Sequence, residues 1–409
     1  MKDSFTLYDA VEETIDGNAA YIFDRATFEN NFKDITHAFR REYRNFKIAY
    51  SFKTNYLGAI CKGILDLGGM AEVVSPYELK YARVIGFGNS DIVYNGVVPD
   101  PLGKFRVAMR GAKVNVDNIV EYEAISSIAA LNGEIVTLGV RVNIDIGNDL
   151  ISRFGVDADG DELSRLMDAI DNDPHVKFGG FHVHIGFGKP VRFWKEKARK
   201  MIELAKRYSP SYIDLGGGMF GLMPEYFAKQ FAEYPGDFVQ YAKATAGQMK
   251  EAFPDESIQL IIEPGTAMVG NTFSVAAHVT AIKELRGKQF VVMDCNSNQL
   301  GFASDTKKLF TEIVHRDGSD KVHVGNGIIA GNTCIDKDYI LNGYAGDVGV
   351  GDIIIFHNVG AYSLSPSRQF IVPRLGVYDS ETGKCILRPS GFSEMFRGFL
   401  DEGFFAEDK

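Results

Sequence analysis

Lys53 stands where a lysine could act as a covalent nucleophile. A largely apolar segment, residues 46–52, leads directly to it, and Thr54 and Asn55 then open a segment with apolar residues at helical spacing. Lys53 therefore lies where a predicted strand ends and a helix begins, which is the end of a parallel barrel that carries chemistry. A lysine among apolar neighbours can form a Schiff base, whereas an ordinary strand-end lysine only reaches solvent. The other motifs of the chain favour the first interpretation.

Two histidines and three glycines follow later apolar segments. His182 and His184 are two residues apart, so a strand would place both on one face. They could bind a metal ion, but no third ligand is evident nearby, and the alternative is that one imidazole lies flat on a ligand ring. Gly216, Gly217 and Gly218 would expose backbone N–H groups, which is typical of a phosphate site, although a plain glycine turn has the same sequence.

Acidic, thiol and phenol groups occur in three further turns. Glu263 ends a predicted strand and could be a general base, a metal ligand or a partner for a protonated ring nitrogen. Gly265 and Thr266 continue its exit turn, which could also be purely structural. The other candidates in later loops are Cys334, Asp336, Asp338 and Tyr362. A buried cysteine and a core tyrosine are the common alternatives for two of these residues.

The apolar segments predict the elements that position these groups. Strand-like segments occur at 46–52, 70–74, 91–94, 113–116, 135–144, 177–185, 211–215 and 258–263. Helical patterns lie between them, for example at 76–85, 118–131, 161–172, 191–207 and 224–252. Eight strand–helix units in about 230 residues have the size of a (β/α)8 TIM barrel. A doubly wound open sheet is the alternative, but no GxGxxG follows the first strand.

The pattern changes after residue 270 to short strands separated by Gly, Asn and Asp turns, which predicts an antiparallel β domain. An early strand near residue 22 could complete this domain, with the barrel inserted between the two parts. We therefore predict an α/β fold with a barrel over 36–270. The second domain, a β-sandwich or β-barrel, would comprise residues 1–35 and 271–409.

The composition excludes several classes of partner. The 409 residues are 45% apolar and 24% charged, as in ordinary globular proteins, and the net charge of −10 argues against nucleic acid or an anionic membrane surface. No apolar segment is long enough to span a bilayer, and the first residues lack the apolar core of a signal peptide. Four cysteines without CxxC spacing are typical of reduced thiols, so we expect a cytoplasmic protein.

Together these motifs resemble the pyridoxal-phosphate decarboxylases of the diaminopimelate and ornithine decarboxylase family, which share the fold type III, alanine-racemase-like barrel. The resemblance covers nearly the whole chain in the same order. In that family a Tyr-Ala-x-Lys-x-Asn segment carries the cofactor, and residues 49–55 are similar to it. The resemblance implies pyridoxal 5'-phosphate on Lys53, with His184 stacked on its ring and Glu263 at its pyridine nitrogen. The other implied cofactor-binding residues are Gly216, Gly217, Gly218, Gly265, Thr266 and Tyr362.

The implied reaction is decarboxylation of an amino acid through a Schiff base at Lys53 and a quinonoid carbanion. Glu263 would keep the ring nitrogen protonated, which makes the ring a strong electron sink. Cys334, in a loop similar to the family's Cys-x-x-x-Asp motif, would protonate the carbanion. The same loop, with Asp336 and Asp338, and Tyr362 would contact the substrate. The resemblance also implies a homodimer with shared active sites, in which Cys334 serves the neighbouring subunit's Lys53.

Several residues depart from the family pattern and leave the substrate open. Thr266 replaces the usual arginine after Glu-Pro-Gly, Phe187 replaces a serine, and Ile335 replaces an acidic residue of relatives that bind basic side chains. Phe310 and Thr306 fall where diaminopimelate enzymes carry tyrosine and arginine. We therefore expect a basic or modified basic amino acid, as in polyamine or lysine-type biosynthesis, and poor turnover of diaminopimelate.

Two other functions fit the same motifs. Amino-acid racemases or epimerases of this fold share the lysine segment, but they place an arginine at the ring nitrogen, so Glu263 favours decarboxylation. An inactive relative that binds a partner protein would have lost the lysine or the glycine loop, and both are present. We expect no metal site.

Overall fold

The computed structural model describes residues 18–147, 151–186, 189–301, 308–316 and 318–400. The chain divides into two compact units. The barrel unit comprises Glu29–Leu222 and Glu233–Met268, and the β unit comprises the described parts of Met1–Phe28, Met223–Ala232 and Val269–Lys409. Residues 29–35 group with the barrel unit because the helix that contains them runs on to Glu42 without a break.

Eight parallel strands close into a barrel, as the sequence pattern predicts. They are β2 (Phe46–Ser51), β3 (Met70–Val73), β4 (Ile92–Tyr94), β5 (Lys113–Val116), β6 (Val136–Asn143), β8 (Val176–His182), β9 (Tyr212–Asp214) and β10 (Gln259–Ile262). Each pairs with its neighbours, and β10 pairs back to β2, so the barrel has no open edge. Most of their residues are buried, because a parallel barrel is covered outside by helices and filled inside by side chains. A two-residue strand, β7 (Val156–Asp157), pairs with β6 outside the closed ring.

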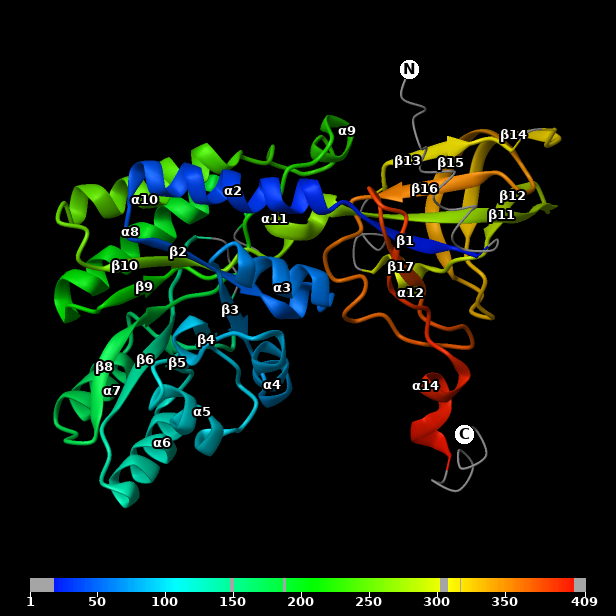
Figure 1. Cartoon of the computed structure of the whole chain (residues 1–409). Helices are drawn as coiled ribbons and strands as arrows, with labels where there is room; N and C mark the ends of the chain where they lie inside the picture. The colour runs from blue at the N-terminus through cyan, green and yellow to red at the C-terminus, as the bar shows by residue number, and fades with distance from the viewer. Residues whose placement is uncertain (1–17, 148–150, 187–188, 302–307, 317, 401–409) are drawn as a thin grey trace. The chain divides into compact units, whose positions relative to one another are not determined.

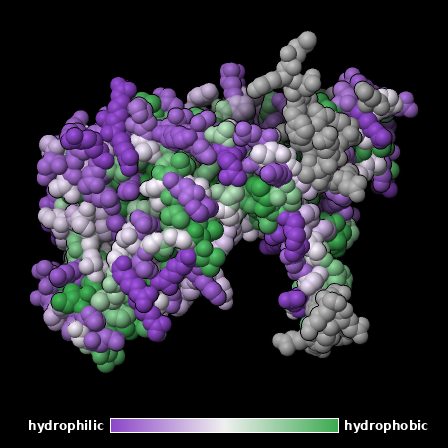
Figure 2. Space-filling view, viewed as in Figure 1, coloured by the Kyte–Doolittle hydropathy of each residue, from purple (hydrophilic) through white to green (hydrophobic). Residues whose placement is uncertain are grey.

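Helices surround the strands of the barrel unit (Figure 1). They are α2 (Arg25–Glu42), α3 (Gly58–Asp66), α4 (Pro76–Ile85), α5 (Pro101–Ala108), α6 (Ile119–Asn132), α7 (Asp161–Asp171), α8 (Val191–Tyr208), α10 (Phe238–Ala252) and α11 (Thr266–Val269). Helix α2 buries Phe28, Phe32, Ile35 and Phe39 at helical spacing. Its visible outer face is largely hydrophilic (Figure 2).

The predicted helix over 224–252 is wrong in its first half. Residues 225–228 form a single turn, α9 (Glu225–Ala228), and α10 begins only at Phe238. Pro235 and Gly236 separate the two, since neither residue favours a helix interior. The side chain of Asp237 then caps α10, and Gln240 completes a capping box.

The β unit is a mixed sheet in which most strand pairs are antiparallel, as predicted, and two pairs are parallel. Its strands are β1 (Ala20–Phe23), β11 (Phe273–Leu285), β12 (Lys288–Met293), β13 (Thr311–Val314), β14 (Lys321–Ala330), β15 (Tyr339–Gly349), β16 (Ile353–His357), β17 (Gly376–Asp379) and β18 (Cys385–Leu387). As expected, β1 completes the sheet, pairing antiparallel with β11. Yet β1 pairs parallel with β17, and β12 pairs parallel with β14. Long connections join both pairs, so no tight hairpin imposes antiparallel direction.

Among the helices that the structure describes, none combines the length and apolar character needed to cross a membrane. The β unit ends, within the described residues, in α14 (Phe392–Phe396) and the short turn η4 (Arg397–Phe399).

Candidate active site

Lys53 lies in a single 3-10 turn, η1 (Phe52–Thr54), directly after β2. Its Nζ donates a hydrogen bond to Oε2 of Glu72 at 2.6 Å, and the Ser51 hydroxyl donates to the same oxygen at 2.7 Å. The side chain of Lys53 is 31% exposed, whereas that of Glu72 is 2% exposed. The buried carboxylate of Glu72 therefore orients the Lys53 amine, and the lysine side chain remains partly accessible to solvent. Motif spacing did not indicate Glu72, although an acidic residue inside the apolar segment 70–74 is a signal that could have identified it.

Glu263 follows β10 and is buried inside the barrel. Its Oε2 lies 3.4 Å from Nε2 of His182, and its Oε1 accepts a hydrogen bond from the Asn95 amide at 2.5 Å. Burial acts to raise the pKa of Glu263, but His182 and Lys53 outweigh burial and hold this pKa below its usual range. Glu263 is thus an ionised carboxylate in a site without direct contact with solvent.

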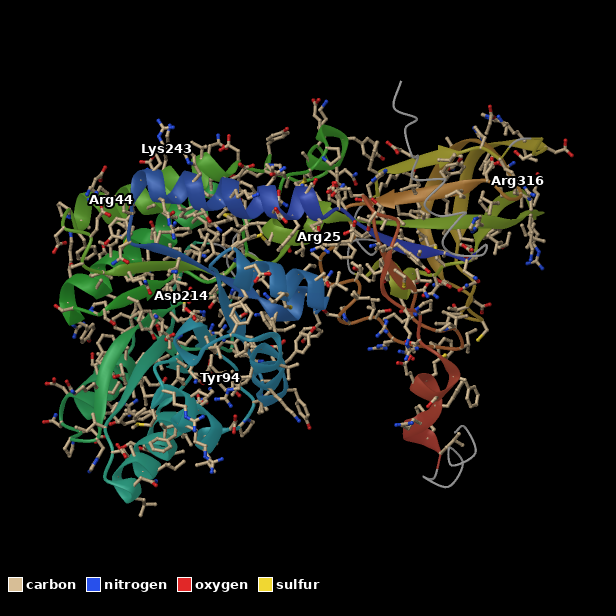
Figure 3. All side chains as sticks on the ribbon, in the orientation of Figure 1. Arg25, Arg44, Tyr94, Asp214, Lys243 and Arg316 are labelled. Carbon is tan, nitrogen blue, oxygen red and sulfur yellow. The ribbon has the colours of Figure 1, made fainter. Side chains whose placement is uncertain are left out.

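Asp214 ends β9 among the barrel strands (Figure 3). Burial and the neighbouring charge of Glu263 raise the pKa of Asp214 well above its usual range. Its Oδ1 accepts the N–H of Gly216 at 2.8 Å. Ligand atoms of His182, Asp214 and Glu263 lie within 4.8 Å of one another, as in a metal site. His182 contacts Glu263 directly, and the Gly216 N–H holds Asp214 beside them, so we assign the cluster to fixing Glu263.

The two histidines point to different partners, so the expectation that they share a strand face is wrong. Strand β8 ends at His182, and the alternation of a strand does not continue to His184. His184 instead accepts the N–H of Gly217 through Nδ1 at 3.0 Å. Burial and the charge of Lys53 lower the pKa of His184 well below its ordinary value. A neutral imidazole fixed in this way can lie against an aromatic ring.

The loop of Gly216, Gly217 and Gly218 requires glycine for two reasons. Gly216 and Gly218 have φ values of +62° and +91°, which favour glycine. A Cβ on Gly217 would lie 2.5 Å from the carbonyl oxygen of Glu263. The N–H groups of Gly216 and Gly217 donate within the protein, whereas that of Gly218 has no hydrogen-bond acceptor among the described residues. The N–H of Gly218 is therefore the donor of this loop that is available to an anion.

Helix α8 supports the glycine loop from behind. Lys197 donates from Nζ to the carbonyl of Gly217, and Trp194 donates from Nε1 to the carbonyl of Gly218, both at 3.4 Å. Burial lowers the pKa of Lys197 to about 7, because the nearby acids offset it only in part. A bound dianion would favour the charged amine. The sequence signal for Lys197 is its place among the apolar residues of α8, where a lysine is unexpected.

The barrel residues fit pyridoxal 5'-phosphate. The reachable amine of Lys53 can bind the aldehyde carbon, and the neutral ring of His184 can lie on the pyridine. The glycine loop, whose Gly217 has no room for a Cβ, can hold the phosphate. The ionised Glu263 can accept a hydrogen bond from a protonated ring nitrogen. Gly265 is buried against Thr54, where a Cβ would lie 2.1 Å from Oγ1 of Thr54, and Thr266 opens α11.

The remaining predicted residues belong to the β unit. Cys334 and Asp336 are exposed in the loop after β14. Asp338 is buried, and its carboxylate accepts hydrogen bonds from the backbone and hydroxyl groups of Ser297 and Thr333. Asp338 therefore fixes this loop, and Asp336 is its exposed carboxylate. Tyr362 adopts a φ of +55°, uncommon for a residue other than glycine.

This combination of barrel, lysine, glycine loop and buried carboxylate defines a pyridoxal-binding barrel. The chain belongs to the pyridoxal-dependent decarboxylase family, because the model of that family's pyridoxal binding domain matches residues 26–270. The protein is a pyridoxal-phosphate-dependent amino-acid decarboxylase, and the match gives no support to the racemase alternative. The departures at Phe187 and Thr306 lie outside the described residues.

Relatives match over nearly the full length. A diaminopimelate decarboxylase of Methanothermobacter thermautotrophicus is 28% identical over 95% of this chain and 94% of its own length. One from Aquifex aeolicus is 24% identical over 94% of this chain and 92% of its own. A diaminopimelate decarboxylase structure from Helicobacter pylori, complexed with L-lysine, superposes with a TM-score of 0.82 at 21% identity, covering 95% of this chain and 98% of that one. The last match shows that the fold is the same.

Proposed function

We propose that this enzyme removes the α-carboxylate of an amino acid whose side chain ends in a basic group. The observation that carries the proposal is the ionised, buried Glu263 in the same barrel as the reachable amine of Lys53. Bound pyridoxal phosphate supplies the ring that withdraws electrons from the substrate. Glu263 holds a proton at the ring nitrogen, which makes that withdrawal strong.

The other residues bind, orient and move protons. Lys53 would hold the cofactor covalently through its amine, and Glu72 orients that amine. The glycine loop and Lys197 hold the phosphate, and His184 fixes the plane of the ring. Gly265, Thr266 and Tyr362 complete the cofactor's surroundings. Cys334 delivers the proton that replaces the lost carboxylate.

The exposed loop selects the substrate in this proposal. Asp336 faces the distal amine of the substrate, while Asp338 fixes the loop that carries Asp336. The relatives named above are diaminopimelate decarboxylases, whose substrate has a second carboxylate as well as a second amine. The neutral Thr266 offers no charge to that carboxylate. We therefore propose a substrate with a distal amine alone, such as lysine or ornithine or a modified form of them.

The test is release of carbon dioxide from a panel of lysine, ornithine, arginine and meso-diaminopimelate. The proposal predicts turnover of one of the first three well above that of meso-diaminopimelate. Efficient turnover of meso-diaminopimelate alone would contradict the proposed substrate class and leave the decarboxylase chemistry in place. Racemised substrate without carbon dioxide would contradict the reaction itself.

We also propose a cytoplasmic homodimer with shared sites. The four cysteines are free, and Cys334 and Cys385 are exposed thiols, which persist in a reducing compartment. In a two-fold dimer, each site would combine Lys53 of one chain with Cys334 of the other. Exchange of subunits between inactive variants, described in the Discussion, tests this arrangement.

A further inference from the structure

A chain of hydrogen-bonded side chains crosses the inside of the barrel and ends at the two functional carboxylates. We call Tyr212, Asn115 and Asn95 the interior chain. The Tyr212 hydroxyl donates to Oδ1 of Asn115 at 2.6 Å, and Nδ2 of Asn115 donates to Oδ1 of Asn95 at 2.7 Å. Nδ2 of Asn95 then donates to Glu263 at 2.5 Å and to Glu72 at 3.4 Å. The interior chain thus reaches both Glu263 and Glu72, the carboxylate that holds Lys53.

These residues come from strands far apart in the sequence. Tyr212 begins β9, Asn115 lies in β5, and Asn95 follows directly after β4. The ends of β9 and β4 can be found from the labels of Asp214 and Tyr94 (Figure 3). All three members of the interior chain are buried, with at most 4% exposure. Buried polar side chains need partners, so a complete chain of this kind fixes the rotamer of each member.

The ionised Glu263 fixes the direction of every hydrogen bond in the interior chain. Asn95 must present its NH₂ group to the carboxylates, because its carbonyl oxygen would be repelled. Its oxygen is then left to accept from Asn115, whose own oxygen is left for the Tyr212 hydroxyl. Tyr212 must therefore donate, and burial raises its pKa far above the ordinary value, so its hydroxyl keeps its proton.

Gly139 in β6 makes room for the far end of the interior chain. A Cβ at this position would lie 2.1 Å from the Tyr212 hydroxyl oxygen and 2.1 Å from Oδ1 of Asn115. These are the two atoms of one hydrogen bond. Alanine would therefore push them apart without removing either polar group.

We propose that Tyr212, Asn115 and Asn95 are positioning residues that keep Glu263 aimed at the cofactor's ring nitrogen. This inference rests on the role proposed for Glu263. If Tyr212 loses its hydroxyl, the oxygen of Asn115 is left buried without a donor, and the Asn115 amide is free to shift or turn over. Asn95 would keep its NH₂ group toward the carboxylates but lose the donor that holds its oxygen, and Glu263 would lose its fixed orientation. A change at Tyr212 thus acts on the cofactor through two intervening side chains.

The experiment compares Tyr212→Phe, Gly139→Ala and Asn95→Leu with the control Tyr43→Phe. Tyr43 is a buried tyrosine of the same barrel unit whose hydroxyl donates to the Ile258 carbonyl at 2.7 Å, outside the interior chain. The readouts are the absorbance of the bound cofactor as a function of pH, turnover, and thermal unfolding. The absorbance follows the protonation of the lysine-bound cofactor, which depends on the ring nitrogen through conjugation, and a merely structural hydrogen bond would not change its pH dependence.

We expect Tyr212→Phe and Gly139→Ala to shift the pH dependence of the absorbance and to lower turnover about tenfold, as for the loss of one buried hydrogen bond between neutral groups. Asn95→Leu should have the larger effect. Tyr43→Phe should lower the unfolding temperature but change neither absorbance nor turnover. If Tyr212→Phe behaves like Tyr43→Phe, the inference is wrong. Should Gly139→Ala not fold, Tyr212→Phe decides alone.

Glu263→Gln, measured in the same assays, separates failure of this inference from failure of the proposed function. If Glu263→Gln loses turnover while Asn95→Leu and Tyr212→Phe keep it, Glu263 acts as proposed and the interior chain does not position it. If Glu263→Gln keeps full turnover, the role of Glu263 is wrong and the inference falls with it.

Discussion

The barrel unit and the β unit hold their reactive groups in opposite ways. In the barrel, the side chains of Glu72, His182 and Glu263 are at most 2% exposed, and hydrogen bonds with neighbouring buried side chains fix them. In the β unit, Cys334 and Asp336 are exposed on a loop that the buried Asp338 fixes. In the function proposed above, this difference would be a division of labour: the barrel would fix the charges that the cofactor chemistry needs, and the loop would meet the side chain of the substrate.

Glu263→Gln tests the barrel side of this comparison and should have the largest effect. A neutral amide cannot hold a proton on the ring nitrogen, so we expect turnover to fall about 1000-fold, the range for a preorganised electrostatic group. Cofactor occupancy should change little, because Lys53 and the glycine loop do not depend on Glu263. Turnover and the cofactor content of the purified variant are the two measurements. Equal losses of both would mean that Glu263 serves binding and not chemistry.

The substrate preference tests the loop side. Lysine or ornithine should be decarboxylated about 100-fold more efficiently than meso-diaminopimelate, because a buried carboxylate without a partner is strongly disfavoured. The kcat/KM ratio is the quantity to compare. Thr266→Arg should narrow the ratio, since arginine would supply the missing charge. An unchanged ratio in Thr266→Arg would show that this position does not face the distal group.

Subunit exchange tests one residue of each unit in a single measurement. Lys53→Ala and Cys334→Ala homodimers should each be nearly inactive. After random reassociation about half of the dimers are mixed, and each mixed dimer has one intact and one doubly altered site, so about a quarter of the original activity should return. Mixing is confirmed by mass. No recovery in confirmed mixed dimers would place Lys53 and Cys334 of one site in the same chain.

Lys197 should affect stability more than chemistry. Its pKa is lowered by burial to about 7, from 10.5, so between these values the unfolded chain holds more protons than the folded one. Lys197 should therefore add to the free energy of unfolding of the cofactor-free protein as the pH rises across this window, by at most about 1.4 kcal/mol per pH unit. Lys197→Met should lack this contribution, so the change in the free energy of unfolding between pH 7 and pH 10, measured with urea, should differ from that of the wild type by this amount. Parallel curves for the two proteins would mean that Lys197 stays charged when buried.

The sequence predicted what depends on strand periodicity and on glycine. All eight barrel strands were found, and α4 was placed at its observed bounds because Ser75 caps it and Gly86 ends it with a φ of +113°. The helix break at Pro235 was missed because the flanking segments are both apolar enough to be helical. In the β unit, the parallel pairing of β1 with β17 could not be predicted, because nothing local sets the direction of strands so distant in sequence.

The site was predicted unevenly for a similar reason. Lys53, Glu263 and the glycine loop stand at strand ends, where one-dimensional spacing locates them. Glu72 and Lys197 were missed because their roles come from partners on other elements, Lys53 and the Gly217 carbonyl. Only burial in three dimensions turns these two ordinary charged residues into functional candidates.

Lys53 is not the only lysine of the barrel that could attack an aldehyde. Lys197 is buried, and its pKa of about 7 leaves much of its amine neutral at physiological pH. Access separates the two: the side chain of Lys53 is 31% exposed, whereas Lys197 is 1% exposed behind the glycine loop. The central claim is therefore that the cofactor is bound to Lys53 and that Lys197 supports its phosphate.

The most direct test is borohydride reduction of the holoenzyme, followed by proteolysis and mass mapping of the modified peptide. We predict that the pyridoxyl group is found on Lys53, that Lys53→Ala yields no fixed adduct, and that Lys197→Met still yields it on Lys53. An adduct on Lys197 in the wild-type enzyme would contradict this assignment.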